Sequence, residues 1–595
     1  MGNRIRIFLA ALLVVSLCLT ITVCAADSGA GTMTSVTETV LTSGLTYYSR
    51  SYSGDGEVRQ AGYSLELSPD SSVYPIFMAC DTIWGGLTMT QCIRYAESLG
   101  YNVVAAANTA FYNNPGVPIG IVVEHGKLRS GQNGLNAFAI LDDGTYYTAK
   151  DPQLHFELSN AAWQTGAVQL TRFNKLYSGD GLHLYSSDYS AVSTRIEEDV
   201  WVVRMKIAEG DMTLGGTVTL EVTDILPEVQ EVPIGSEYLI LTASSEGAYS
   251  DFYSRFAIGD RITITSVCND ETLQKAAYVS GCGDILIEDG KITDESTWSP
   301  FVAGSHPRTL MGWKADGTLV IYAADGRRAG YANGLTQRQA AEEMLRQGCV
   351  YAVNLDGGGS TTLGVRLPGD STVSVVNMPS DGGQRQCAGF VLLVTDAKQD
   401  GRVCNLHLEQ NNLIVLPGQQ VELCAFGTDA ALYPVQSADA VAFFAERGKM
   451  DGHIYIAPMT SGKDRISIWG GGASGEGNIR VVSNLTRLEV TNEYGRPLEG
   501  NIVLRNGEAL KLSITAEYQE RPLYADYSTV SYTMSTPLGY VDENGMFVAD
   551  AIPGTTGTLT LTIGDHSLDV NVTVTGPQRD ALSGRYKMAL DYLRK

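Results

Sequence analysis

The sequence predicts an α+β domain with mixed sheets and extra β segments at residues 66–396, followed by two all-β immunoglobulin-like sandwich domains. Three observations predict this class. Strand-like runs dominate residues 66–396, but two segments there have the apolar spacing of amphipathic helices. Residues 400–575 contain short alternating strands separated by turns, with almost no helical spacing. Each half of that region offers about seven such strands, which is typical of an immunoglobulin-like sandwich.

The first residues have the pattern of a secretory signal. Arg4 and Arg6 precede an apolar run at 7–23, and small residues around Ala25 suit cleavage. We therefore expect residues 1–25 to be a signal peptide, and the protein to be secreted, extracellular or associated with the cell surface. An uncleaved N-terminal anchor is the alternative. After cleavage we expect no membrane span, because no later run is long and apolar enough.

Residues 26–65 are rich in Ser, Thr, Gly and Tyr and predict an N-terminal β segment that leads into the α+β domain. One helix of that domain begins near Thr88. The second begins at Thr336, where a glutamine three residues later completes a capping box. A buried strand follows each helix and ends in an asparagine, Asn108 in the first case and Asn354 in the second.

A weak internal duplication accompanies these two helix–strand units. Residues 121–128 (IVVEHGKL) match residues 285–292 (ILIEDGKI) in character, and residues 136–147 resemble 308–322, each with a D-G-T turn. Two halves with the same strand order would bring the two asparagine ends close together. The alternative is that these are merely common hairpin turns. Between the halves, residues 150–280 predict further strands in a barrel-like β addition.

The C-terminal region divides into two similar segments. Residues 400–482 predict the first immunoglobulin-like domain and residues 483–575 the second, with a late hairpin at 539–550. We expect these domains to act as spacers or as carbohydrate and cell-wall contacts. Residues 576–595 predict a short amphipathic tail helix.

Charge and metal-binding residue types exclude several classes of function. The formal net charge of −24 argues against nucleic acid as a partner. Neither the cysteines nor the histidines have zinc-type spacing. Cys80 could bridge to Cys92, and Cys404 to Cys424, but buried free thiols are an equally good expectation.

The segment NLDGGGSTT at 354–362 is the main candidate for a ligand site. It lacks the lysine of a phosphate-binding P-loop and the spaced third glycine of a dinucleotide-binding loop. A tight turn with exposed N–H groups can still bind an anion such as phosphate. The alternative, a sharp turn that needs left-handed backbone, accounts for one glycine but not for three.

Three further loops carry candidate side chains. Arg308 precedes an apolar strand and could bind a phosphate or carboxylate, unless it is an ordinary surface arginine. Phe111 and Tyr112 could stack on a sugar ring, unless they pack in the core. Arg385 lies among small residues before the strand FVLLV.

Taken together, these four loops resemble the phosphodiester glycosidase family over roughly residues 75–396. The motifs that carry the resemblance are NLDGGGSTT, RTLMGWKADGTLVIYAADGR, GLTQRQAAEEMLRQGC and PSDGGQRQCAGFVLLV. Some positions depart from the family pattern: Asn-Gly-Gly-Phe-Phe is Asn-Thr-Ala-Phe-Tyr at 108–112, and Arg-Pro-Val is Arg-Gln-Cys at 385–387. The resemblance implies a catalytic domain that releases a sugar from a glycosyl-1-phosphodiester, with doubt about which sugar the domain accepts.

The resemblance also implies roles for individual residues. Asp356 would act as base or nucleophile at the anomeric carbon, with Asp325 as the second carboxylate that glycosidase chemistry asks for. Alternatively, Asp356 could bind Ca²⁺; no other cofactor is expected, and the metal ligands are unknown. The expected substrate-binding residues are Asn108, Phe111, Tyr112, Arg308, Thr309, Asn354, Gly357, Gly358, Gly359, Ser360, Thr361 and Arg385.

Two other functions remain open from the sequence. One is an exo-glycosidase that acts on a polysaccharide without phosphate. The other is a surface protein that binds a phosphoglycan without turning it over.

Overall fold

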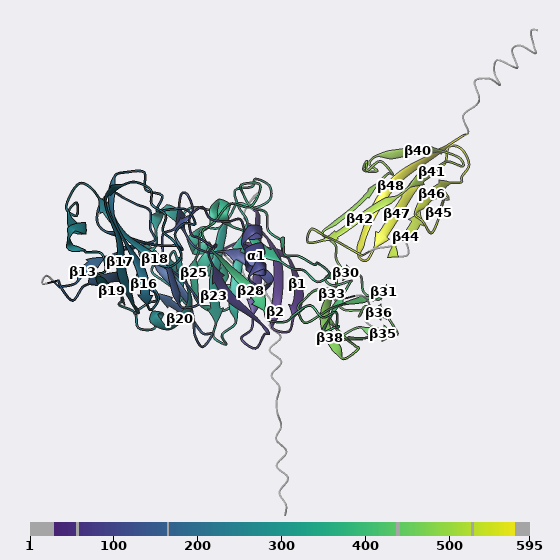
Figure 1. The fold of residues 1–595 in the computed structure, drawn as a ribbon. Coiled ribbons are helices and arrows are strands. Elements are labelled where there is room, and N and C mark those ends of the chain that lie inside the picture. Colours follow the sequence, from purple (N-terminus) through teal and green to yellow (C-terminus); the bar gives the residue numbers. More distant parts are fainter. Residues whose placement is uncertain (1–28, 55–58, 164–165, 436–440, 525–528, 577–595) are drawn as a thin grey trace, which may run out of the picture.

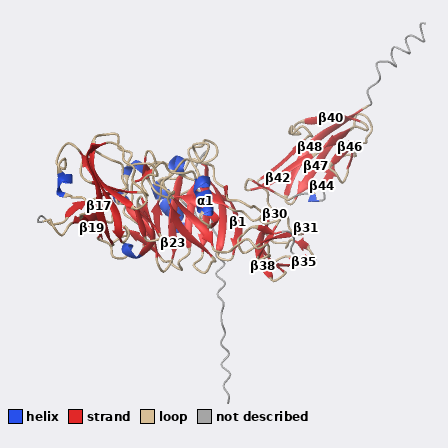
Figure 2. Cartoon of the chain, viewed as in Figure 1, coloured by secondary structure: helices blue, strands red, loops and turns tan. Residues whose placement is uncertain are grey.

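The computed structural model describes residues 29–54, 59–163, 166–435, 441–524 and 529–576 (Figure 1). The predicted signal peptide and most of the predicted tail helix lie outside these residues. Strands dominate the described chain, and its two α-helices, α1 (Met89–Ser98) and α2 (Gln337–Arg346), have ten residues each (Figure 2). No described helix is long and apolar enough to span a membrane.

Eight strands form the sheet that carries the glycine-rich segment, and every neighbouring pair in it is antiparallel. The predicted mixed sheet is therefore wrong here, because hairpins and not helical crossovers connect most neighbours. The predicted N-terminal segment is part of this sheet, and its expected end at residue 65 falls inside β3. In spatial order the strands are β1 (Thr32–Thr42), β2 (Leu45–Ser53), β3 (Arg59–Leu67), β24 (Leu319–Ala324), β23 (Arg308–Lys314), β25 (Cys349–Asn354), β21 (Ile285–Glu288) and β22 (Lys291–Ile292).

A second, five-stranded sheet repeats half of this arrangement. Both sheets place a central strand between two hairpins, and all pairs are antiparallel. The order β11-β10-β20-β8-β9 thus matches β24-β23-β25-β21-β22. The strands of the second sheet are β11 (Tyr146–Ala149), β10 (Asn136–Leu141), β20 (Ala276–Cys282), β8 (Val122–Glu124) and β9 (Lys127–Ser130).

The turns and the register support the duplication predicted from the sequence. His125 and Asp289 both have left-handed backbone, with φ of 50° and 49°, and each precedes a glycine with positive φ in its hairpin turn. Gly281 pairs with Ala137, as Asn354 pairs with Leu310, six residues before the aspartate of each D-G-T turn. Gly281 and Asn354 therefore occupy equivalent positions.

The third sheet brings the other helix–strand unit to the same place. Its order is β27 (Ser374–Val375), β26 (Leu363–Val365), β5 (Asn102–Asn108), β28 (Phe390–Thr395) and β4 (Val73–Met78). Both helices begin with complete capping boxes, at Thr88 and Thr336. The box at Thr336 was predicted, whereas the one at Thr88 was not. Buried apolar side chains from this sheet, α1 and the eight-stranded sheet form one core.

Between the halves, the chain forms an eight-stranded sheet with its own core. The predicted strands are confirmed. One parallel pair, β14 with β15, is found among the described residues of this sheet. In spatial order the strands are β13 (Val168–Leu170), β12 (Leu154–Ser159), β19 (Arg261–Cys268), β17 (Thr217–Val229), β16 (Val200–Glu209), β18 (Tyr238–Ser244), β15 (His183–Ser186) and β14 (Arg172–Phe173).

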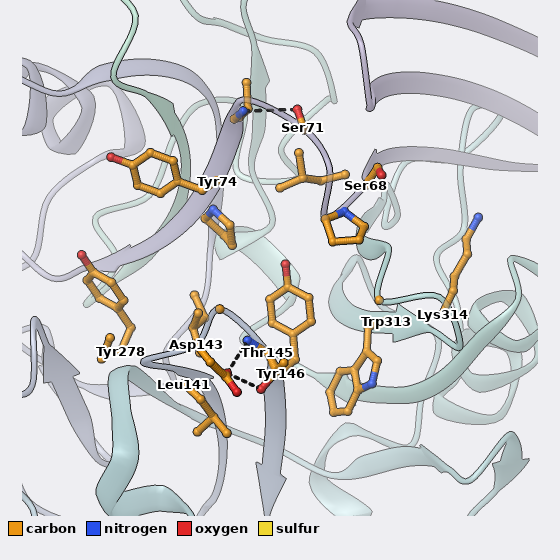
Figure 3. Close-up of a pocket in the computed structure, with 18 of the residues that line it drawn as sticks. Ser68, Ser71, Tyr74, Leu141, Asp143, Thr145, Tyr146, Tyr278, Trp313 and Lys314 are labelled. Atoms are coloured by element: carbon orange, nitrogen blue, oxygen red, sulfur yellow. Dashed lines mark hydrogen bonds between the residues drawn. The ribbon is translucent and has the colours of Figure 1, made fainter.

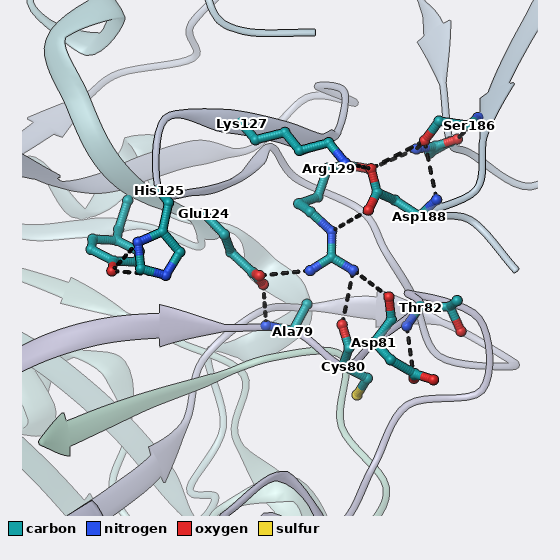
Figure 4. Close-up of polar contacts among 12 residues, drawn as sticks. Ala79, Cys80, Asp81, Thr82, Glu124, His125, Lys127, Arg129, Ser186 and Asp188 are labelled. Carbon is teal, nitrogen blue, oxygen red and sulfur yellow. Dashed lines mark hydrogen bonds and ion pairs between the residues drawn. The ribbon is translucent and has the colours of Figure 1, made fainter. Parts of the chain in front are cut away.

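Two buried cations connect this β insertion to the rest of the domain. Arg129 pairs with Glu124 at 2.6 Å and with Asp188 at 3.0 Å, and it also donates to the carbonyls of Cys80 and Asp81 (Figure 4). Lys175 donates to the carbonyls of residues 118–120 at 2.8–3.0 Å and to Ser130. Burial lowers the pKa of Lys175 well below its usual value. These contacts hold the loop that follows β6 (Tyr112–Asn113) and β7 (Val117–Pro118).

The C-terminal region forms two all-β modules with two hydrophobic cores, and the core of the second module also includes Ile414 and Leu416 from the first. The hairpin predicted at 539–550 is present. The first module contains β29 (Asn405–Leu408), β30 (Leu413–Val415), β31 (Gln420–Glu422), β32 (Ala425–Thr428), β33 (Pro434–Val435), β34 (Ala442–Ala445), β35 (Lys449–Asp451), β36 (Ile454–Ile456), β37 (Gly462–Gly470) and β38 (Ala473–Val481). The second contains β39 (Arg487–Thr491), β40 (Asn501–Arg505), β41 (Ala509–Lys511), β42 (Ser513–Tyr518), β43 (Arg521–Pro522), β44 (Ser531–Met534), β45 (Gly539–Val541), β46 (Met546–Ala549), β47 (Thr556–Ile563) and β48 (His566–Thr575).

Both modules contact the edge strand β1 of the large sheet (Figure 1). Glu38 forms an ion pair with Lys463 at 2.7 Å. The backbone N–H and carbonyl of Glu38 also form hydrogen bonds with the side chain of Asn412. Arg521 donates to the carbonyl of Val36. The cysteines that the sequence offered as disulfide partners, at 80 and 92 and at 404 and 424, are free thiols.

Candidate functional site

The ends of β5 and β25 meet through the side chain of Asn108, as predicted, although the duplication makes β20 and not β5 the equivalent of β25. Asn108 donates to the carbonyl of Asp356 at 2.6 Å and accepts from the hydroxyl of Thr309 at 2.8 Å and from the backbone N–H of Thr362 at 3.1 Å. The amide is fully buried, and three of the four hydrogen bonds it can make are made within the protein. Asn108, Thr309 and the buried Thr361 therefore brace the loop, and their burial argues against the predicted contact with substrate.

Asp356 is the first residue of this loop after Leu355, and Asn108 holds its carbonyl. Burial raises the pKa of its carboxyl from 3.8 to about 6, although hydrogen bonding from Ser360 and the N–H of Gly357 and the charge of Arg385 oppose the rise. A carboxyl with a pKa near 6 can both hold and release a proton near neutral pH. The position and chemistry of Asp356 therefore fit the predicted catalytic role.

The structure gives a reason for each of the three glycines. A Cβ at Gly357 would lie 2.7 Å from the carbonyl oxygen of Pro307. Gly358 has a φ of +62°, and a Cβ there would meet the guanidinium of Arg327 at 3.1 Å. A Cβ at Gly359 would collide with the ion pair of Arg385 and Asp381. The triplet thus allows two guanidinium groups to approach the loop backbone closely.

The N–H groups of the loop are less available than the sequence suggested. The N–H of Gly358 donates to Pro307 at 2.9 Å and that of Ser360 to Gly357 at 3.3 Å, which closes the short turn at 358–360. The N–H of Gly357 interacts with the Asp356 carboxyl. The predicted anion cradle of bare N–H groups is therefore wrong for these three positions.

Cationic side chains surround the loop instead. The exposed Arg385 lies 3.5 Å from the hydroxyl of Ser360 and interacts with Tyr112, which also contacts Ser360. The exposed Arg327 covers Gly358 from the other side. Sequence reasoning missed Arg327, which lies beside the predicted Asp325. Its φ of +59°, which is uncommon for a residue other than glycine, became visible only in the structure.

Arg308 does not join these cations. Its side chain is buried and donates to the carbonyls of Leu335 at 2.8 Å and Gly304 at 2.7 Å. Burial, and then the nearby charge of Arg327, lower the pKa of Arg308 to about 10. Arg308 therefore fixes two neighbouring loops, and its predicted contact with phosphate is not supported.

Asp325 also has a structural environment. It accepts from the Asn377 amide at 2.9 Å, from the Met378 N–H at 2.9 and 3.0 Å and from Tyr331 at 3.0 Å. Burial raises the pKa of its carboxyl, and these hydrogen bonds oppose the rise. Asn377 in turn donates to the carbonyl of Thr361 at 3.1 Å. Asp325 therefore positions the segment beneath the loop, and the structure does not support it as the second catalytic carboxylate.

Phe111 and Asn354 line a cavity of about 450 Å³ next to the loop. Asn354 is buried, and its side-chain oxygen has no hydrogen-bond partner among the described residues. The remaining walls come from residues 119, 134–136, 283–284 and 297–301. Phe111 and Asn354 therefore face a space large enough for a ligand, as predicted.

A larger cavity of about 570 Å³ lies at the opposite end of β23 (Figure 3). Aromatic rings including Tyr146 and Trp313 line it, and none of the predicted site residues does. Arg308 and Trp313 occupy opposite ends of the same strand, so this cavity is separate from the glycine loop. Within the described residues, no group of three or more His, Cys, Asp or Glu side chains could hold a metal ion.

Comparison with known proteins agrees with the motif resemblance. Residues 235–394 match the sequence model of the phosphodiester glycosidases. This match supports a phosphodiester glycosidase domain in this part of the chain. The matched region runs from β18 to β28, so it contains Asp356, the glycine triplet, Arg327 and Arg385. Phe111 and Tyr112 lie outside the match.

Individual phosphodiester glycosidase relatives share short segments with the chain. Human N-acetylglucosamine-1-phosphodiester alpha-N-acetylglucosaminidase is 38% identical over 86 residues, which cover 13% of this chain and 16% of the human protein. The SPbeta prophage-derived uncharacterized protein YomE of Bacillus subtilis (strain 168) is 35% identical over 102 residues, or 17% and 15% of the two chains. The catalytic domain of the zebrafish N-acetylglucosaminidase has a TM-score of 0.31 and 14% identity, covering 61% of this chain and 88% of that one.

Proposed function

We propose that this phosphodiester glycosidase relative is a secreted hydrolase that releases a sugar from a glycosyl-1-phosphodiester in a phosphoglycan, cell-wall or capsule glycan. The observation that carries the proposal is Asp356, a carboxyl with a pKa near 6 in a loop between two guanidinium groups. The human relative's name states the same class of reaction, on an N-acetylglucosamine phosphodiester.

The reaction would be a displacement at the anomeric carbon. Asp356, in its ionised form, would take a proton from water while the water oxygen forms a bond to the carbon. The bond between that carbon and the phosphate oxygen breaks, and its electron pair leaves with the phosphomonoester. Because phosphate is a good leaving group, the step needs little help from a second carboxylate, which suits the structural role of Asp325.

Arg385 and Arg327 would hold the phosphate in place of the predicted Arg308. Both are exposed, and both lie against the loop backbone, at Gly359 and Gly358. A guanidinium presents paired N–H donors that match the oxygens of a phosphate group. The ion pair of Arg385 with Asp381, at 2.7 Å, orients one of the two guanidiniums.

The test follows sugar release from methyl phosphodiesters of several sugar 1-phosphates, with both anomers of each sugar. We expect the wild type to release sugar and Asp356→Asn to lose at least about 1,000-fold in kcat, since the amide cannot accept the proton. Asp143→Asn, a change in an exposed hairpin turn far along the chain, is the matched control and should keep the wild-type rate. A chelator is included because Ca²⁺ at Asp356 was the alternative.

Other outcomes would favour the alternatives. Release from glycosides without phosphate, at equal or higher rates, would support an exo-glycosidase for polysaccharides. Binding of phosphoglycans without any release would support a non-catalytic surface protein. Secretion, and cell-wall contact through the two C-terminal modules, are further parts of the proposal, and fractionation of cells with the intact and truncated chain would test them.

A further inference from the structure

The cavity beside Asp356 differs in charge from the arginine side of the loop. Its lining includes one carboxylate, Asp284, and no lysine, arginine or histidine. Two phenyl rings, those of Phe111 and Phe301, contribute to the walls. Phe301 is 94% exposed, so it contributes little to the core and is available to a ligand.

Neighbouring residues connect this cavity to the reacting group. Phe111 lines the cavity, whereas the next residue, Tyr112, interacts with Ser360 and Arg385. Asn354 likewise lines the cavity two residues before Asp356. The cavity and the cationic side of the loop are therefore adjacent, with Asp356 at their junction.

Asn354 indicates that a ligand completes the cavity. Its side-chain oxygen is buried and lacks a partner among the described residues, and such a group is costly to leave without a hydrogen-bond donor. By contrast, the Asn136 amide nearby is used on both sides, by the N–H of Asp151 and the carbonyl of Gly283. A hydroxyl or amide N–H of a sugar would supply the donor that Asn354 lacks.

Asp284 shapes the cavity and gives it a negative charge. Both carboxylate oxygens accept from the N–H of Ser299, at 3.0 and 3.1 Å, and this contact holds the short turn at 300–302 that carries Phe301. Gln337 of α2 donates to the same carboxylate. The buried guanidinium of Arg308 also interacts with Asp284. No cation lies among the residues that line the cavity, so a second negative group in the cavity would still face Asp284 directly.

We propose that this cavity is the sugar subsite and that it selects an uncharged sugar, excluding uronic acids and other sugars with an anionic substituent on the ring. The inference rests on the proposed function, since it assigns the two ends of a glycosyl phosphodiester to the two sides of Asp356. The neutral ring lies between Phe111 and Phe301 and donates to Asn354, and the phosphate lies at Arg385 and Arg327. Asp284 repels a ring carboxylate.

The first experiment compares matched sugars. Whichever neutral hexosyl methyl phosphodiester the enzyme hydrolyses is compared with its uronic acid counterpart, which differs by one carboxylate. We expect kcat/KM to be at least about 100-fold lower for the uronate, because like charges at close range cost several kcal/mol. Asp284→Asn keeps an oxygen for the Ser299 N–H and should reduce this preference to less than about tenfold.

The second experiment removes the aromatic wall. Phe301→Ala should raise KM for the neutral substrate by roughly three- to tenfold with little change in kcat, as expected for loss of one ring contact. Phe444→Ala removes another exposed phenyl ring, 58% exposed in the first C-terminal module, and should have no effect. Equal hydrolysis of both sugars by the wild type, or an unchanged KM in Phe301→Ala, would overturn the inference while the proposed function stands.

If no phosphodiester is hydrolysed, binding measurements can still test the sugar subsite. Calorimetry with the wild type would then compare glucose 1-phosphate with glucuronic acid 1-phosphate, and repeat the comparison in Phe301→Ala. Preference for the neutral sugar that is lost with Phe301 would support the subsite although the proposed reaction had failed. Absence of any preference would reject the subsite as well.

Discussion

Asp356 should weaken the folded protein at neutral pH, and its replacement by asparagine should therefore stabilise it. Burial raises the pKa of the Asp356 carboxyl from 3.8 to about 6. A folded-state pKa above the unfolded value means that the folded protein binds the proton more tightly. The contribution of the Asp356 carboxyl to the free energy of unfolding is therefore highest below about pH 4 and is lost as pH rises through about 6.

The size of the effect follows from the same two values. The difference between 3.8 and about 6 corresponds to roughly 3 kcal/mol, at about 1.36 kcal/mol for each tenfold change in proton affinity. Asp356→Asn removes the titration. Because pH 4 already lies slightly above the unfolded pKa of 3.8, the free energy of unfolding of the variant, minus that of the wild type, should increase by roughly 2.5 kcal/mol between pH 4 and pH 7. Any constant packing difference cancels in this comparison.

Urea unfolding followed by tryptophan fluorescence can measure this difference. Five of the six tryptophans lie before residue 396, so the signal reports mainly on the domain that contains Asp356. Both proteins are unfolded at pH 4, 5, 6 and 7. A difference that stays constant with pH, or that shrinks as pH rises, would refute a raised pKa at Asp356.

Four further substitutions separate binding from stability. Arg385→Met should raise KM for a phosphodiester by about 10- to 100-fold, as expected for loss of a charge-assisted hydrogen bond, whereas Arg308→Met should leave KM unchanged and lower the urea midpoint. Lys175→Met leaves three consecutive carbonyls without a donor and should cost about 2–4 kcal/mol of unfolding free energy; an unchanged midpoint would contradict the buried contacts. Asp325→Asn should cost about 2 kcal/mol, because an amide N–H would face the donor of Met378, and an equal loss in kcat would instead restore a catalytic role.

Local patterns allowed good prediction of the helices, hairpins and loop. Thr336 and the glutamine three residues later form the capping box that was predicted, because a cap depends only on residues within one turn. The two duplicated hairpins were likewise predictable from their turn residues. The sequence also singled out Asp356 as the candidate catalytic group, since the glycines around it needed an explanation beyond a turn.

Contacts between distant segments could not be predicted from one sequence. Arg308 stands at the start of a strand and Arg327 shortly after the end of one, so their sequence contexts look alike. Only the packing shows that Arg308 is buried against carbonyls whereas Arg327 covers Gly358. Asn108 had the same difficulty, because its amide bonds three partners at distant positions in the sequence. The two predicted helices are present, but the arrangement of the hairpins around them depends on pairing between distant strands, which one sequence does not reveal.

The two duplicated half-sheets contribute different residues to the candidate site. Gly281 and Asn354 are equivalent in register, so Gly283 stands in the first half where Asp356 stands in the second. A Cβ at Gly283 would already lie 3.0 Å from the ring of Phe111. The first half-sheet has no side chain at Gly283, which leaves room for the ring of Phe111. The two half-sheets have similar folds, but only the second carries a carboxylate at this position, so the candidate site is built on one side of the duplicated pair.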